Sequence, residues 1–301
     1  MKKIQCGVIG ASGYLGQQLA QYVKANEIAI DIIPYIRLHR KFIAEGREAQ
    51  TKFDVLLNLG TPNEVLSRQG GQVAKNAINE WSEHLEIAIK QAKPIQVVHL
   101  STFHIFGNLK SAMNDDSPTI GGNAYGDLHL TCLEIVKHLA SKYATGLSNI
   151  IPSNIYGTVS PSLIPRTDLI LNLALERLRN HQFLHLKSDG SGLRDFLWIE
   201  NALQAFCAVI LRKTSKDYDT VVVASEITMS VQKALEALFS VLGKGAFASW
   251  CEFGQLSEKV IPLTFSCNNL KTIMGEWKPL NVLSAAGNQK TIFNINEKLI
   301  S

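Results

Sequence analysis

Three residues in the middle of the chain have side chains that suit proton transfer. Tyr125 and His129 are four residues apart, one helical turn, so both can face the same side of a helix. Thr102 directly follows the apolar run 97–101, which has the character of a buried strand. A phenol and a hydroxyl that meet at one substrate oxygen can hold it and move its proton, and a cation one turn away would favour the ionised phenol. We therefore expect Tyr125 to donate and accept the proton, with Thr102 and His129 beside it.

A glycine-rich turn lies near the start of the chain. Gly10, Gly13 and Gly16 are spaced by three between the apolar run 4–9 and a helical pattern that begins at Leu15. In such a turn the first glycine allows the chain to reverse, the second lets the backbone approach a pyrophosphate, and the third allows close helix packing. A purely structural turn is the alternative. We expect a dinucleotide cofactor at this turn.

The end of the second predicted strand, 28–36, bears on which cofactor binds. Arg37 follows it, and His39, Arg40 and Lys41 come next, with no carboxylate among them. An NAD site usually places an acid here for the ribose hydroxyls, whereas a basic residue suits the 2′-phosphate of NADP. The pattern favours NADP over NAD, and a solvated basic loop is the alternative.

These residues need a scaffold, and the order of elements predicts one. Apolar strand patterns at 4–9, 28–36, 55–59, 97–101, 147–151 and 221–224 alternate with helical patterns such as 128–139. Strands that are apolar along their whole length, with a helix between most of them, indicate a parallel sheet covered on both faces. The expected fold is α/β, a doubly wound parallel sheet of the Rossmann type.

The pattern loosens after about residue 155. Loops containing proline and helices at 169–178 and 199–211 indicate a smaller, mixed second part. We expect a dinucleotide-binding domain over residues 1–155, which also receives the strand near 220–224, and a substrate-binding domain over residues 156–301.

Composition excludes several classes of protein. The 301 residues are 46% hydrophobic and 19% charged, with a net charge of +4, which is ordinary for a globular protein and too weakly basic for a nucleic-acid surface. The five cysteines lack metal-ligand spacing, and no apolar stretch approaches the ~18 residues of a membrane span. We expect a cytoplasmic protein without a metal, nucleic-acid or membrane partner. A homodimer is left open.

Seven segments resemble the extended short-chain dehydrogenase/reductase family of nucleotide-sugar epimerases, dehydratases and reductases. The resemblance covers nearly the whole chain. The segments are Gly10–Gly16, Asp54–Gly60, Ser101–Gly107, Tyr125–His129, Pro152–Gly157, Gly192–Glu200 and Asn269–Leu280. They are similar to the family's glycine motif, fourth strand, Ser/Thr segment, Tyr-x-x-x-Lys motif, nicotinamide border, phosphate-binding arginine segment and C-terminal helix.

The resemblance implies residue roles. Thr102, Tyr125 and His129 fall on the catalytic positions. Cofactor contacts are implied for Gly10, Ser12, Gly13, Tyr14, Leu15, Arg37, Gly60, Thr61, Tyr125, His129 and Ile155, and substrate contacts for Phe103, His104, Asn154 and Arg194. The substrate would be a nucleotide-linked sugar whose phosphates meet Arg194.

Three positions depart from the family pattern. His129 replaces the lysine, Ile151 stands where many relatives carry arginine, and Phe103 and His104 replace the Asp-Glu pair of the 4,6-dehydratases. Imidazole is mostly neutral at pH 7, and Phe103 cannot carry a proton, so dehydration is disfavoured. We expect an NADP-dependent oxidoreductase acting on a nucleotide-linked keto-sugar, a ketoreductase or epimerase. The alternative is a non-catalytic or weakly active NAD(P)-binding protein.

Overall fold

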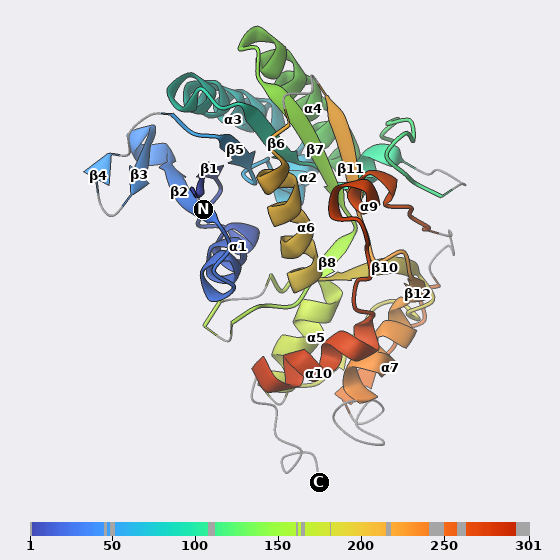
Figure 1. The fold of residues 1–301 in the computed structure, drawn as a ribbon. Coiled ribbons are helices and arrows are strands. Elements are labelled where there is room, and N and C mark those ends of the chain that lie inside the picture. Colours follow the sequence, from blue (N-terminus) through green and yellow to red (C-terminus); the bar gives the residue numbers. More distant parts are fainter. Residues whose placement is uncertain are drawn as a thin grey trace.

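The protein is a mixed α/β structure built on one large sheet (Figure 1). The computed structural model describes residues 2–44, 47–48, 52–107, 112–160, 162–163, 166–180, 182–214, 218–240, 250–257 and 263–292. Within these residues the large sheet has eight strands, in the order β11-β7-β6-β5-β1-β2-β3-β4. The first six of that order run parallel, and β3 and β4 are antiparallel. The predicted fold class is confirmed.

The bounds of the six parallel strands agree closely with the apolar runs. They are β1 (Ile4–Ile9), β2 (Ile30–Ile36), β5 (Val55–Asn58), β6 (Gln96–Leu100), β7 (Gly146–Pro152) and β11 (Asp219–Val223). The antiparallel strands β3 (Lys41–Ala44) and β4 (Arg47–Glu48) were not predicted. Along β5, Val55 and Leu57 belong to one hydrophobic cluster and Leu56 to a second. Because successive side chains of a strand point to opposite faces, this alternation shows that both faces of the sheet are buried.

Helices cover the two faces of the sheet. On one face lie α1 (Tyr14–Ala25), α6 (Ile199–Arg212) and α9 (Asn268–Met274), whose apolar side chains share the cluster of Val55 and Leu57. On the other lie α3 (Gly71–Ala92) and α4 (Ala124–Lys142), with the short α2 (Glu64–Gln69) packed against both. In Figure 1, α3 and α4 are together at the top of the view.

A second, smaller group of elements lies at the lower end of Figure 1. It contains α5 (Ile170–Arg179), α7 (Val231–Ser240), α10 (Val282–Ile292) and a three-stranded sheet of β12 (Thr228–Ser230), β10 (Leu193–Trp198) and β8 (Asn154–Tyr156). A two-stranded sheet pairs β9 (Leu184–His185) with β13 (Cys251–Glu252). Between the β10–α6 segment and β12 the chain returns to the large sheet as β11, which pairs with β7. The domain boundary at residue 155 stays a prediction.

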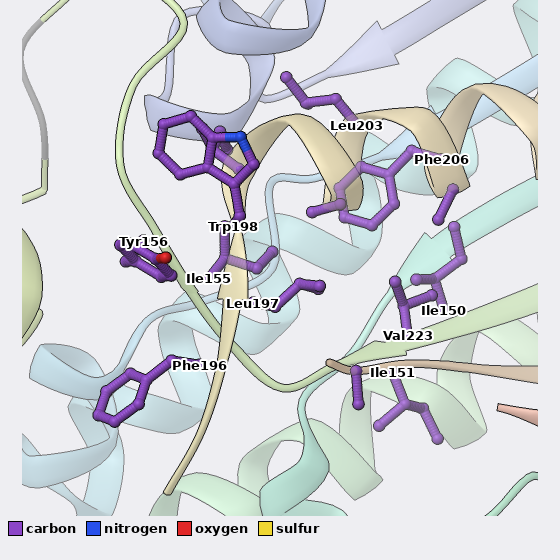
Figure 2. Close-up of a cluster of buried hydrophobic side chains, with 14 of the residues drawn as sticks. Ile150, Ile151, Ile155, Tyr156, Phe196, Leu197, Trp198, Leu203, Phe206 and Val223 are labelled. Atoms are coloured by element: carbon purple, nitrogen blue, oxygen red, sulfur yellow. The ribbon is translucent and has the colours of Figure 1, made fainter. Parts of the chain in front are cut away.

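The two groups of elements share a hydrophobic cluster. Figure 2 shows Ile151 and Val223 of the large sheet close to Leu197 of β10 and Phe206 of α6. Trp198 ends β10 and is fully buried. Burial of this much apolar surface stabilises the arrangement of the second group against the sheet.

The basic segment after β2 is partly regular structure. Arg37–His39 form a 3-10 turn, η1, and Lys41 begins β3, which pairs antiparallel with β2. Phe42 holds β3 to the sheet through edge contacts with the rings of Tyr35 and Phe53, at 5.2 and 4.6 Å between centroids. Arg37, His39, Arg40 and Lys41 are themselves exposed, so the alternative of a solvated basic segment stays open.

Asp195 joins three segments around the end of the large sheet. Its carboxylate is fully buried and accepts hydrogen bonds from the Ser153 and Ser225 hydroxyls and from the backbone N–H groups of Ser225 and Ile227. Burial raises the pKa of Asp195, while these hydrogen bonds to the charged form lower it. The carboxylate therefore replaces its lost hydration with bonds that fix the neighbouring loops.

We expect Asp195→Asn to lower the free energy of unfolding by about 1–3 kcal/mol, because an amide cannot accept all of these donors. Urea unfolding followed by circular dichroism measures it. Asp168→Asn, an exposed position, is the control and should change stability by less than about 1 kcal/mol. Equal stability of Asp195→Asn and wild type would show that the loops are held by packing alone.

Candidate active site

The glycine turn is closed by close backbone contacts. Gly10 has φ +84°, and a Cβ there would lie 2.9 Å from the backbone nitrogen of Gly60. At Gly16 a Cβ would lie 2.4 Å from the carbonyl oxygen of Gly10. Only glycine fits at these two positions, so α1 starts directly on the turn and the ends of β1 and β5 lie together.

The start of α1 fits an anionic group. Gly13 caps the helix without a side-chain hydrogen bond, and the first turn has no acidic residue. The first backbone N–H groups and the helix dipole therefore favour a pyrophosphate, and Ser12 and Gly13 are exposed at that point. Of the residues predicted to contact a cofactor, Gly10, Ser12, Gly13, Tyr14, Leu15 and Gly60 are brought together here.

Arg37 lies beside the same turn. Its guanidinium donates a hydrogen bond to the carbonyl oxygen of Gly60 at 3.1 Å, and the side chain is exposed. Arg40 instead forms an ion pair with Glu83 at 2.7 Å. Thr61 lies one residue beyond Gly60, and its hydroxyl donates to the Leu100 carbonyl at 3.4 Å. Arg37 is thus placed where β2, β1 and β5 end.

A cavity of about 230 Å³ lies between the glycine turn and the second group of elements. Its walls include eight predicted site residues: Tyr14, Leu15, Thr102, Phe103, His104, Tyr125, Asn154 and Ile155. The other lining residues are Leu100, Ser101, Pro152, Ser153, Arg166 and Leu169. The cavity is at the carboxyl ends of β6 and β7, the end of a parallel sheet at which ligands bind.

Tyr125 is held by short local motifs on both sides of the cavity. Asn123 caps α4 by accepting from the backbone N–H of Gly126 at 2.9 Å, which sets the first turn that carries Tyr125. Thr102 accepts from the N–H of His104 at 3.4 Å and so begins the 3-10 turn η2 (Phe103–Phe106). This turn places the His104 ring against the Tyr125 ring, with 5.4 Å between centroids. Proton-carrying groups from two elements therefore meet at one cavity.

His129 lies behind Tyr125 and outside the cavity wall. Its ring contacts the Tyr125 ring edge-on at 4.6 Å, it is only 4% exposed, and neither ring nitrogen has a hydrogen-bond partner among the described residues. Burial, and secondarily the nearby His104, lower the pKa of His129 to about 3. The imidazole is neutral near pH 7 and cannot supply a lysine-like charge. Its predicted contact with a ribose stays a prediction that requires a ring nitrogen to become accessible.

Arg194 is not among the residues that line the cavity. It lies on β10, where its guanidinium donates to the Leu193 carbonyl at 2.8 Å, so its predicted contact with substrate phosphates stays a prediction. Arg166 does line the cavity and was not predicted. It pairs with Asp168 at 2.7 Å, and Asn172 holds its carbonyl oxygen at 3.0 Å. Arg166 lies outside the seven motifs and before the start of α5, and no periodic pattern in the sequence indicates it.

Two further features bear on the site. Within the residues that the structure describes, none of the helices combines the length and hydropathy needed to cross a bilayer. The same residues contain no group of three or more His, Cys, Asp or Glu side chains arranged to hold a metal ion.

The fold and the glycine turn define an α/β protein of the dinucleotide-binding type, with a cavity of mixed polar and apolar lining next to the turn. The chain belongs to the NAD dependent epimerase/dehydratase family, whose family model matches residues 6–224. The predicted family and the nicotinamide type of cofactor are thereby confirmed. None of the curated proteins matches the chain significantly.

Solved structures of low sequence identity share the fold. UDP-glucuronic acid 4-epimerase from Bacillus cereus, in complex with UDP-glucuronic acid and NAD, is 16% identical with a TM-score of 0.72, over 98% of this chain and 100% of that chain. dTDP-glucose 4,6-dehydratase from Bacillus anthracis with NAD is 14% identical, with a TM-score of 0.75 and 98% of each chain covered. RMD from Pseudomonas aeruginosa, complexed with NADPH, is 15% identical with a TM-score of 0.73, over 98% and 100%.

Because His129 is buried, we expect the free energy of unfolding to depend on pH. Its folded pKa of about 3 is below the ordinary value of ~6.5, so its contribution to stability is complete above pH ~6.5 and is lost as the pH falls towards 3. Between pH 7.5 and pH 5, we expect the free energy of unfolding of His129→Leu to fall by about 1–2 kcal/mol less than that of the wild type. Urea unfolding at the two pH values measures this, with His39→Gln, at an exposed position, as control. An identical pH dependence in His129→Leu and wild type would contradict it.

Proposed function

We propose that the protein is an NADP(H)-dependent oxidoreductase that acts on a nucleotide-linked keto-sugar, as a ketoreductase or an epimerase. The observation that carries this proposal is the shared cavity of Tyr125, Thr102 and His104, next to the glycine turn. A phenol, a hydroxyl and an imidazole around one space suit the oxygen of a carbonyl or alcohol. The nucleotide-sugar ligand named for one solved structure of the same fold supports the substrate class.

Within this proposal, a nicotinamide cofactor held at the turn of Gly10 and Gly13 would supply or accept hydride. Tyr125 donates its phenolic proton to the carbonyl oxygen during reduction, and Thr102 donates a hydrogen bond to the same oxygen. Tyr14 and Ile155 close the cavity on the cofactor side, and Tyr14 is fixed by its hydroxyl donating to the Gly157 carbonyl at 2.6 Å. A neutral phenol is the form that reduction needs, so the neutral His129 is less of a handicap in that direction.

The substrate side of the cavity is formed by Phe103, His104 and Asn154. Phe103 stacks on His104 with 4.3 Å between ring centroids, and Asn154 donates to the Asp195 carbonyl at 2.9 Å. Without a carboxylate on this wall, water elimination is disfavoured, which leaves ketone reduction or epimerisation through a transient ketone. Arg194 would bind the diphosphate from the second group of elements.

The preference for NADP over NAD rests on Arg37. Its exposed guanidinium beside Gly60 provides a charged donor where the ribose 2′-phosphate is expected. Structures of the same fold contain either cofactor, NADPH in RMD and NAD in the epimerase and the dehydratase. We therefore assign the choice between NADP and NAD in this chain to the charge of Arg37.

We expect Arg37→Ala to weaken NADPH binding roughly ten- to a hundred-fold and to leave NADH binding unchanged, because a charge-assisted contact to phosphate is worth ~1.5–3 kcal/mol. Calorimetric titration of both cofactors measures this. Arg40→Ala, which removes a neighbouring charge that is paired with Glu83, is the matched control and should leave the ratio unchanged. Equal affinity of the wild type for NADPH and NADH would exclude the NADP preference.

We expect Tyr125→Phe to lower the rate of turnover of nucleoside-diphosphate keto-sugars with NADPH at least ~10²-fold. Its affinity for the cofactor should stay within about two-fold of that of the wild type. Tyr143→Phe, at the far end of the same helix, is the control. Absorbance of NADPH across a panel of uridine, thymidine and guanosine diphosphate keto-sugars gives the rates. Turnover that persists in Tyr125→Phe would remove Tyr125 from the chemistry.

A second candidate is a non-catalytic or weakly active NAD(P)-binding protein. The observation that favours it is the neutral, inaccessible His129 at the position of the family's lysine. Tight cofactor binding without turnover of any sugar in the panel by the wild type would support this candidate over the oxidoreductase. A homodimer stays a prediction for either.

A further inference from the structure

Three buried polar side chains form a row across the middle of the sheet. Asn58 of β5 is registered beside His99 of β6, and His99 beside Asn149 of β7. All three have no exposed surface. They follow Leu56, Val97 and Leu147 by two residues in their strands, so they face α3 and α4. We name Asn58, His99 and Asn149 the polar row.

Two hydrogen bonds, from Gly60 to Asn58 and from Asn58 to His99, point the same way along the row. The backbone N–H of Gly60 can only donate, and it donates to Asn58 Oδ1 at 3.2 Å. The other atom of the amide, Nδ2, therefore faces His99 Nδ1, at 3.0 Å, and donates to it. Because a neutral imidazole has one N–H and one acceptor, the hydrogen of His99 must be on Nε2.

The helix α4, which carries Tyr125 and His129, packs against β6, which carries His99. Burial, with the neighbouring His129, lowers the pKa of His99 to about 3, so both imidazoles are neutral. Among the described residues, His99 Nε2, both ring nitrogens of His129, both amide atoms of Asn149 and Trp81 Nε1 have no hydrogen-bond partner. Trp81 of α3 lies over the row, its ring centroid 6.2 Å from that of His99. Buried polar groups in such number are normally satisfied by internal water.

We infer that Asn58, His99 and His129 form a directed hydrogen-bond relay, completed by buried water, that sets which nitrogen of His129 carries hydrogen beneath Tyr125. Asn58 and His99 are positioning residues in this relay, since they act through His129. The His99 N–H donates to the water, and the water donates to one nitrogen of His129. The other nitrogen of His129 then carries the hydrogen.

The relay connects two parts of the site. Gly60 contacts the glycine turn, where the cofactor is expected, and His129 contacts the ring of Tyr125. A shift of the Gly60 N–H would change the orientation of the Asn58 amide and through it the tautomers of both histidines. The consequence for catalysis rests on the proposed function, whereas the relay itself does not.

Long-range proton–nitrogen correlation spectra of protein labelled with ¹⁵N-histidine test the relay without any substrate. The chain has eight histidines, and the His99→Gln and His129→Gln spectra assign the two signals. At pH 7 we expect His99 to have an acceptor-type Nδ1 and a hydrogen-bearing Nε2, His129 to be in a single tautomer, and both rings to show cross-peaks to long-lived water. An even mixture of tautomers at His99, or a hydrogen on its Nδ1, would overturn the inference.

Asn58→Asp reverses the first step of the relay. A carboxylate accepts from both Gly60 and His99, so the hydrogen should move to His99 Nδ1 and the nitrogen shifts of His129 should change with it. Gln96→Glu makes the same amide-to-carboxylate change in β6, but Gln96 donates to Ser148 on the α6 side. Gln96→Glu should therefore leave the tautomers and the nitrogen shifts of His99 and His129 unchanged.

An unchanged His129 in a folded Asn58→Asp protein would show that the relay ends at His99 and would overturn the inference. If Asn58→Asp does not fold, the wild-type spectra decide, because an even mixture of tautomers at His129, or no cross-peak from His129 to long-lived water, would overturn the inference. Wild-type protein with the expected tautomers and no turnover of any keto-sugar would refute the proposed function and leave the relay standing.

Discussion

The contact between the first turn of α1 and the glycine turn is the constraint on which the rest of the site depends. Gly16 lies against the Gly10 carbonyl, which places α1 directly over the ends of β1 and β5. Tyr14 and Gln18 of the same helix then bind the segment after β8, through the Gly157 carbonyl and through Thr158 and Val159. One close approach of backbones therefore positions both the dinucleotide turn and the far wall of the cavity.

Several polar side chains are buried around the site, and each lowers the stability of the protein unless it is hydrogen-bonded. Asp195 is satisfied by several donors, whereas His129 and Asn149 have no partner among the described residues. A buried neutral polar group without a hydrogen bond costs about 1–3 kcal/mol, so such groups are kept where they serve structure or function. Residue 129 is a neutral ring near pH 7, and a neutral ring costs less free energy to bury than a charged side chain would.

The second group of elements is part of the same core. Leu197 of β10 lies towards Val223 of the large sheet in Figure 2, Trp198 contacts the ring of Tyr156, and β8 continues from β7 after Ser153. Because the lining residues Asn154 and Ile155 lie on this shared segment, the width of the cavity depends on that packing. A change in the packing of either group would therefore alter the shape of the cavity.

Local patterns in the sequence were enough for the six parallel strands of the large sheet, for the glycine turn and for the helical spacing of Tyr125 and His129, since periodicity and glycine spacing depend on residues a few positions apart. Together with the resemblance to the family, they led to eight of the residues that line the cavity. Only the tertiary structure decided that His129 is enclosed, that Asn58 and His99 are hydrogen-bonded 41 residues apart, and that Arg166 reaches the cavity. Burial, and with it the protonation of a histidine, is set by what packs around the side chain from distant segments, and no local spacing encodes those distances.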